Sequence, residues 1–181
     1  MKLYRIKIAL RGISPMVWRR LQIPGNTSLA NLHHIIQIAN GWEDEYLHQF
    51  HIYGKDYGIA YEGGLMFVDN AHTVYMDDFK FDIGDKFTYE YNFFKHWVVD
   101  IRIEGIDEAS TSQPSVYCIK GNGMPGANKS DEIECTLNLL KAIAHADDTT
   151  KLSDLRLFVE ALNAVRFNRR HINKRLQTEM E

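Results

Sequence analysis

The sequence predicts an α+β fold: a ββα opening, a mixed or antiparallel sheet with helices packed on it, and two C-terminal helices. Apolar residues alternate at period two through much of the first 120 residues, whereas the chain after about residue 131 has helical periodicity alone. This order of elements favours one α+β domain over residues 1–181. Its sheet-rich part spans about 1–120, and its C-terminal helices span about 131–177.

The first 40 residues predict two strands followed by a helix. Apolar side chains alternate through residues 4–10, and residues 16–23 form the returning strand. Thr27 or Ser28 is suited to cap a helix that runs to about Asn40, because its apolar residues recur at helical spacing.

The middle of the chain predicts a third strand and a hairpin. The third strand covers residues 46–53, and residues 54–78, rich in Gly, Asp and Asn, form a long irregular excursion. A hairpin is predicted over residues 86–106, with Phe94 exposed at its tip. Its odd-numbered positions, expected to face the covered side of the sheet, include Tyr89, Tyr91, Phe93, Trp97, Val99 and Ile101.

The last third of the chain predicts a short strand and two helices. The strand covers residues 115–121, and the helices cover residues 131–145 and 153–177, each with one apolar stripe. Strands come first and helices last, as in many α+β domains.

Composition limits the classes of function. A net charge of −3 and a pI near 6.2 argue against a generally basic nucleic-acid binder. Cys118 and Cys135 form no CxxC pair, so neither a structural zinc module nor a disulfide framework is indicated. Since the sequence shows neither a signal-peptide core nor a run of about 18 apolar residues, we expect a cytoplasmic protein with no membrane partner.

Three segments and one residue carry a resemblance to a known family: SPMVWRRLQIPGNTSLANLHHIIQIANGW (residues 14–42), LHQF (47–50), KFTYEYNF (86–93) and Trp97. In this order and spacing they resemble the plasmid pRiA4b ORF-3-like family, over roughly the first 105 residues. The resemblance implies an origin in a plasmid or other mobile element. The matching residues are Pro15, Trp18, Arg19, Arg20, Leu32, His33, Gly41, Trp42, Leu47, His48, Phe50, Tyr91, Phe93 and Trp97.

The chain departs from the family's pattern at polar positions. Where that pattern has His, Asp, Gly, Asp and His, this chain has Tyr46, Asn92, Phe94, Lys95 and Val99. A cluster of carboxylates and imidazoles is suited to hold a divalent metal or to perform acid–base chemistry, and the residues found here are not. The resemblance therefore implies that any such site is degenerate. We expect no catalytic residue, no cofactor, and no divalent metal between the hairpin and the third strand.

Two histidines are the remaining metal candidates. His33 lies on the apolar stripe of the first helix and His48 on the apolar face of the third strand, so they could meet across the helix–sheet interface. The simpler interpretation is a pair of core histidines that bond to backbone carbonyls; a role as ligands or as a switch is the alternative.

Clustered cations are candidates for contact with phosphates or with a partner. One small basic group lies beside Trp18, and a larger one lies near the end of the last predicted helix. Cations there also suit the helix dipole and need no partner. The candidates are Arg19, Arg20, Arg166, Arg169, Arg170, Lys174 and Arg175.

These observations favour a non-catalytic binding or adaptor protein of plasmid or mobile-element origin, with a protein or nucleic-acid partner. A metal-dependent or acid–base enzyme with a degenerate His/Asp site is one alternative. Contact with nucleic acid through the basic C-terminal helix is another, and a purely structural or oligomerising protein is a third.

Overall fold

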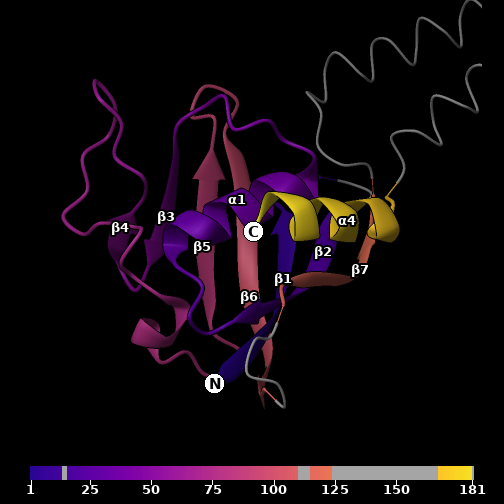
Figure 1. The fold of residues 1–181 in the computed structure, drawn as a ribbon. Helices are drawn as coiled ribbons and strands as arrows, with labels where there is room; N and C mark the ends of the chain where they lie inside the picture. Colours follow the sequence, from indigo (N-terminus) through magenta and orange to yellow (C-terminus); the bar gives the residue numbers. More distant parts are fainter. Residues whose placement is uncertain (14–15, 110–114, 124–166, 181) are drawn as a thin grey trace, which may run out of the picture.

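The computed structural model describes residues 1–13, 16–109, 115–123 and 167–180. Most of them build one seven-stranded sheet with the strand order β4-β3-β5-β6-β1-β2-β7, in which every pairing is antiparallel (Figure 1). The strands are β1 (Lys2–Leu10), β2 (Trp18–Pro24), β3 (His48–Ile52), β4 (Lys55–Tyr57), β5 (Lys86–Tyr91), β6 (Trp97–Glu108) and β7 (Tyr117–Asn122). Two α-helices, α1 (Leu29–Asn40) and α4 (Arg169–Glu179), and the 3₁₀ helix η1 (Met76–Phe79) complete the described elements.

The expected α+β class, with helices packed on the sheet and two C-terminal helices, is wrong. The described residues are mainly an antiparallel sheet with two α-helices, of which the C-terminal one is small. The helix expected at residues 131–145 lies outside the described residues. The helix expected over 153–177 begins, in its described part, only at Arg169, because Asn168 has extended backbone and its side chain accepts the N–H of His171 as an N-cap.

The predicted ββα opening is confirmed. The first two strands pair directly, and Ser28 caps α1 by accepting a hydrogen bond from the N–H of Asn31. The helix ends at Gly41, whose φ of 69° is left-handed and suits a residue without a Cβ atom. Local sequence patterns were sufficient to predict this opening, because the pairing of β1 with β2 and the cap of α1 join residues that are close in the sequence.

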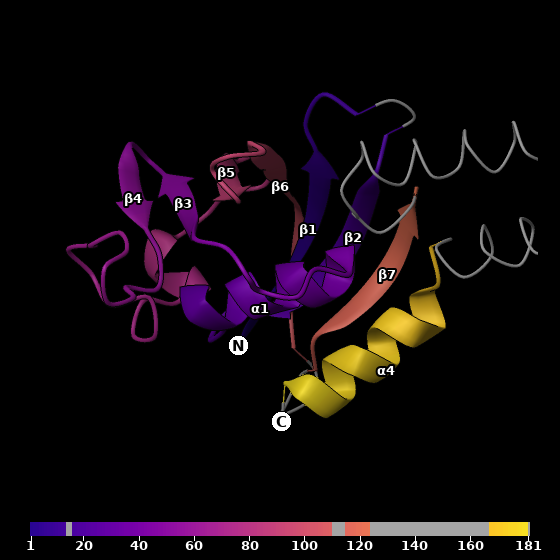
Figure 2. The same cartoon turned by 90° about the horizontal axis from the view of Figure 1, so that it is seen from above.

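The core lies between α1 and one face of the sheet. Seen from above, the sheet curves around α1, and α4 lies along β7 (Figure 2). Alternate residues of the central strands point to this inner face, and α1 meets them with its apolar side. The fully buried residues include Tyr4, Ile6, Ile8, Leu21, Ile23, Leu32, Ile36, Tyr89, Ile101 and Ile103. The outer face of the sheet carries polar and charged side chains.

The predicted hairpin is confirmed, but its tip differs from expectation. Tyr89 and Tyr91 are buried on the inner face, as are Val99 and Ile101, whereas Phe93 and Trp97 are only partly buried. Phe94 is 96% exposed.

The left-handed residues of this loop are Asn92 (φ 54°) and His96 (φ 48°). The carboxamide oxygen of Asn92 accepts a hydrogen bond from the N–H of Lys95 at 3.3 Å, which stabilises the turn between these two residues.

The irregular excursion begins with a strand. β4 pairs with β3, and further along the chain Tyr75 forms a single bridge with Ser28. None of the helices in the described part of the chain is both long and apolar enough to cross a membrane.

Candidate metal centre

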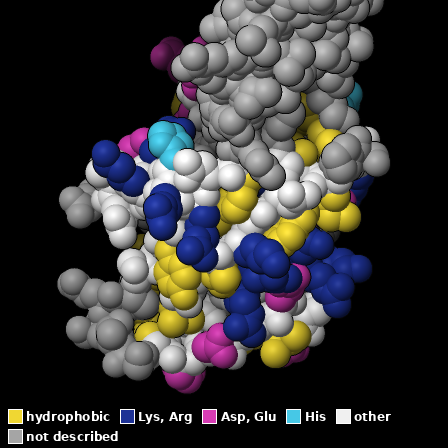
Figure 3. Space-filling model, turned by 90° about the vertical axis from the view of Figure 1, so that its right-hand side faces the viewer, with side chains coloured by type: hydrophobic (Ala, Val, Ile, Leu, Met, Phe, Trp, Pro, Cys, Tyr) yellow, Lys and Arg dark blue, Asp and Glu magenta, His cyan; other side chains and the backbone are white. Residues whose placement is uncertain are grey.

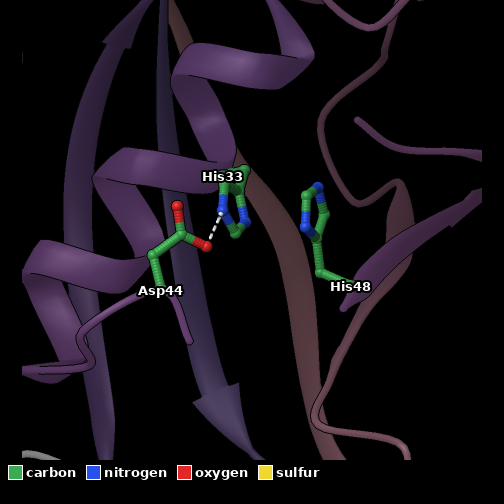
Figure 4. Close-up of side chains that lie close together, drawn as sticks. All are labelled: His33, Asp44 and His48. Carbon is green, nitrogen blue, oxygen red and sulfur yellow. Dashed lines mark hydrogen bonds and ion pairs between the residues drawn. The ribbon is translucent and has the colours of Figure 1, made fainter. Parts of the chain in front are cut away.

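Two buried histidines stack against each other between α1 and β3. Their ring centroids are 3.5 Å apart and the ring planes are inclined by 13°; His33 is 0% exposed and His48 is 2% exposed. Figure 4 shows the two rings facing each other, with the carboxylate of Asp44 beside His33. The expectation that these histidines meet across the helix–sheet interface is confirmed.

Asp44 is the third member of the cluster. It lies in the connection between α1 and β3 and has a left-handed φ of 56°. Its Oδ1 is 2.7 Å from Nε2 of His33, and its Oδ2 is 3.5 Å from Nδ1 of His34. One ligand atom from each of His33, Asp44 and His48 lies within 4.8 Å of the others.

Asp44 was not among the candidates that the sequence indicated. The available signal was its position, because a short connection holds this carboxylate between the helix and the strand that carry the two histidines.

A closed ring of hydrogen bonds holds His33 in one tautomer. The N–H of Asp44 donates to Oε1 of Gln37 at 3.1 Å, which orients the amide so that Nε2 of Gln37 donates to the Tyr89 hydroxyl at 2.7 Å. The Tyr89 hydroxyl is then free to donate to Nδ1 of His33 at 2.8 Å, and His33 donates from Nε2 to Asp44. His33 is thus bonded to side chains rather than to the expected backbone carbonyls.

His48 is not satisfied in the same way. Its Nε2 accepts the N–H of Ile59 at a long distance of 3.4 Å, and its buried Nδ1 has no hydrogen-bond partner among the described residues. A buried polar atom without a partner destabilises a fold by about 1–3 kcal/mol. Such an atom in a polar cluster calls for an explanation other than packing.

The electrostatic setting keeps both imidazoles neutral. Burial, helped by the neighbouring His34, lowers the pKa of His33 to about 3. Burial and then the adjacent His33 lower the pKa of His48 to about 3, although the charge of Asp44 opposes this. Burial also raises the pKa of Asp44 above its ordinary value. Neutral imidazole is the form that ligates metals.

Two imidazoles and one carboxylate are donors that suit a zinc ion or a related divalent transition metal. Each ring lone pair lies in the ring plane, so coordination by both rings requires a tilt out of the stacked arrangement. The single ring proton of His33 must also move from Nε2 to Nδ1. His33 would then carry its proton on Nδ1 and donate it to Tyr89, which is the usual outer-shell arrangement around a metal-bound histidine.

Arg19 and Arg20, the two arginines next to Trp18, lie on opposite faces of the sheet. Arg19 is fully buried; its Nε donates to the carbonyl of Ala39 at 2.9 Å, and its guanidinium lies 4.9 Å from the ring of Phe167. Burial lowers its pKa to about 10, so it remains charged at neutral pH. Arg20 points to the outer face and forms an ion pair with Glu104.

The other basic candidates lie on α4, except Arg166, which is outside the described residues. Arg169 donates to the carbonyl of Ile119 at 3.3 Å, and Arg175 pairs with Glu179 one turn later. Arg170 and Lys174 line a hollow of about 460 Å³ between α4 and β7. Among the described residues, no hydrogen bond or ion pair joins these α4 side chains to the histidine cluster or to Arg20.

Comparisons with known proteins support the resemblance seen in the sequence. A model of the family described as plasmid pRiA4b ORF-3-like protein matches residues 2–174. The uncharacterized protein y4hQ of Sinorhizobium fredii is 32% identical over 101 residues, which are 55% of this chain and 52% of that protein, so the match spans about half of the relative.

A solved structure shares the fold. The protein of unknown function MM3350 from Methanosarcina mazei Go1 superposes with a TM-score of 0.66 and covers 94% of this chain and 96% of its own. Its sequence identity is 22%, so this likeness concerns the fold alone.

Proposed function

This chain belongs to the plasmid pRiA4b ORF-3-like family, and we propose that it is a binding protein whose ligand is a divalent transition-metal ion held by His33, Asp44 and His48. The observation that carries the proposal is the convergence of three donor atoms within 4.8 Å of one another, together with a buried Nδ1 of His48 that has no partner among the described residues. This replaces the expectation of a chain without a metal.

Packing alone accounts poorly for this cluster. A buried polar network stabilises a core when every member is satisfied, and a partly satisfied one is worse than an apolar core. The ring from Asp44 through Gln37 and Tyr89 to His33 is complete, but His48 stacks on it with one nitrogen unbonded. A metal ion would be the partner that this nitrogen lacks if His48 carried its ring proton on Nε2, which would end the long contact from the N–H of Ile59.

Zinc is the ion that the donors favour. Zinc is commonly bound by imidazole nitrogen and carboxylate oxygen in a tetrahedral arrangement, and three protein ligands leave one position open. Asp44 is 29% exposed and the side chain of His34 beside it is 42% exposed, so solvent reaches this side of the cluster. Water would complete the coordination.

The test is metal retention by protein purified without chelators, stripped, reloaded with zinc or cobalt(II), and dialysed. The wild type should retain one equivalent, measured by elemental analysis, and cobalt should give the absorption bands of a tetrahedral site. His48→Asn and Asp44→Asn should each weaken binding by at least about 100-fold, since loss of an outer-shell partner alone weakens metal sites by about 10- to 100-fold.

A second His–Asp pair provides the matched control. Nδ1 of His51 lies 2.7 Å from Oδ1 of Asp56, but both side chains are more than half exposed and no third ligand completes a cluster among the described residues. His51→Asn should bind zinc as the wild type does. Equal loss in His51→Asn and His48→Asn, or a wild type that retains no metal, would overturn the proposal.

A further inference from the structure

Five cations form a row across the outer face of the sheet. The strand register places each directly opposite the next, from β5 to β7: Lys86, Arg102, Lys7, Arg20 and Lys120. Lys86, Arg102 and Lys120 are exposed, and Lys7 and Arg20 are half-buried. Figure 3 shows Lys and Arg side chains gathered on the side of the molecule that carries β7 and α4.

Such a row opposes folding. Like charges directly opposite each other on neighbouring strands destabilise a sheet, whereas alternating charges stabilise it. With neighbouring strands about 4.8 Å apart, the cationic row extends for about 19 Å. A face that needed only to be soluble could carry opposite charges at these positions, so the row indicates a ligand that neutralises it.

Protein carboxylates neutralise little of the row. Arg20 pairs with Glu104, but no carboxylate among the described residues lies within ion-pair distance of the other four cations. Arg20 first, and then Lys7 and Arg102, lower the pKa of Glu104, so three members of the row share this one carboxylate.

The same face is hollowed beside the row. A groove of about 640 Å³ is lined by four cations, Lys7, Arg11, Lys86 and Arg102, and by one carboxylate, Asp100, which is already paired with Arg11. Tyr53, which is 63% exposed, lies at the edge of this groove. The groove therefore combines excess positive charge with an exposed aromatic ring.

We propose that the outer face of the sheet binds the phosphate backbone of a single-stranded nucleic acid, which follows the row from Lys86 to Lys120. Charge complementarity selects a polyanion, and the row is long enough for several successive phosphates. An open sheet face with an exposed aromatic ring, that of Tyr53, suits an unpaired base, which stacks on it.

A duplex fits less well. Major-groove readers insert a helix or a β-ribbon into the groove, but α1 lies on the other face of the sheet and α4 lies along its edge strand (Figure 2). The binding is sequence-independent, since the row contacts phosphates and not base edges.

The test is fluorescence anisotropy with a labelled oligothymidylate over a range of salt concentrations. A triple variant, Lys7→Gln, Lys86→Gln and Arg102→Gln, should bind at least about tenfold more weakly than the wild type at low salt. Its log–log salt slope should be smaller in magnitude by about 2, since each lost contact with a single strand removes about 0.7. Melting curves will establish that each variant is folded.

The matched control removes three cations from α4: Arg170→Gln, Lys174→Gln and Arg175→Gln. This variant has the same change in net charge and should bind as the wild type does. Equal weakening by both triple variants would mean that only net charge matters and would overturn the proposal. Tighter binding to a duplex or to polyglutamate than to the oligothymidylate would also overturn it, the latter assigning the face to an acidic protein.

Discussion

The hydroxyl oxygen of Tyr89 lies 2.8 Å from Nδ1 of His33 and also accepts a hydrogen bond from Gln37, although Tyr89 itself is 0% exposed. Tyr89→Phe removes this oxygen and leaves Nδ1 of His33 and Nε2 of Gln37 buried without it. We therefore expect the free energy of unfolding to fall by about 1–3 kcal/mol in urea. Tyr53→Phe, at an exposed hydroxyl bonded to Asp85, should change it by less than about 0.5 kcal/mol. Equal stability of Tyr89→Phe and the wild type would show that the ring does not stabilise the fold.

The two buried histidines should make the metal-free protein sensitive to acid. Burial lowers both pKa values from 6.5 to about 3, so the unfolded chain binds protons near pH 6.5 when the folded chain does not. The stabilisation is complete above about pH 6.5 and is lost as pH falls towards 3, by up to about 1.4 kcal/mol per pH unit for each histidine. Burial raises the pKa of Asp44, which acts in the opposite direction.

Comparison with a variant isolates the contribution of His48. Urea unfolding between pH 7 and pH 4 should show a shallower pH dependence for His48→Asn than for the wild type. If His48→Asn keeps the wild-type slope, His48 titrates in the folded protein much as it does in the unfolded chain.

The hairpin tip offers a stabilising substitution. His96 has a left-handed φ of 48°, a conformation that is unfavourable by about 1–2 kcal/mol for most residues and open to Gly. Since Gly also gains entropy in the unfolded chain, His96→Gly should raise the free energy of unfolding by a net amount of up to about 1 kcal/mol. Phe94→Gly, at a position without a left-handed φ, should lower it. The opposite order in thermal unfolding would contradict the loop geometry.

Relief of like-charge repulsion should stabilise the sheet. Arg102 is exposed and lies directly between Lys86 and Lys7 on the neighbouring strands. Arg102→Thr removes two repulsive cross-strand pairs and introduces a β-branched residue, so we expect a gain of about 0.2–1 kcal/mol at low salt. The gain should shrink at high salt, where the repulsion is screened. A loss of stability at low salt would mean that the row is not repulsive in the folded protein.

Several features followed from the sequence because they depend on near neighbours. The ββα opening, the third strand and the hairpin were evident from apolar periodicity, a Ser at the start of the helix and a Gly at its end. The family resemblance rested on the same part of the chain. The predicted fold class was wrong. Apolar stripes at helical spacing in the last third of the chain suggested a layer of helices, but periodicity does not predict how many strands join one sheet, and here seven do.

Both candidate sites depended on contacts between residues far apart in the chain. Asp44 joins His33 only because the connection after α1 turns back over the helix. Its place in the sequence between the two histidines made it a candidate, but did not specify this contact. The two-residue periodicity of the strands places Lys7 and Arg102 on polar faces. It specifies neither which strands are neighbours nor the register in which they pair. Strand order put β1 between β6 and β2, and only that pairing aligned the cations into a row, because hydrogen bonding between strands, and not local preference, sets which side chains lie opposite.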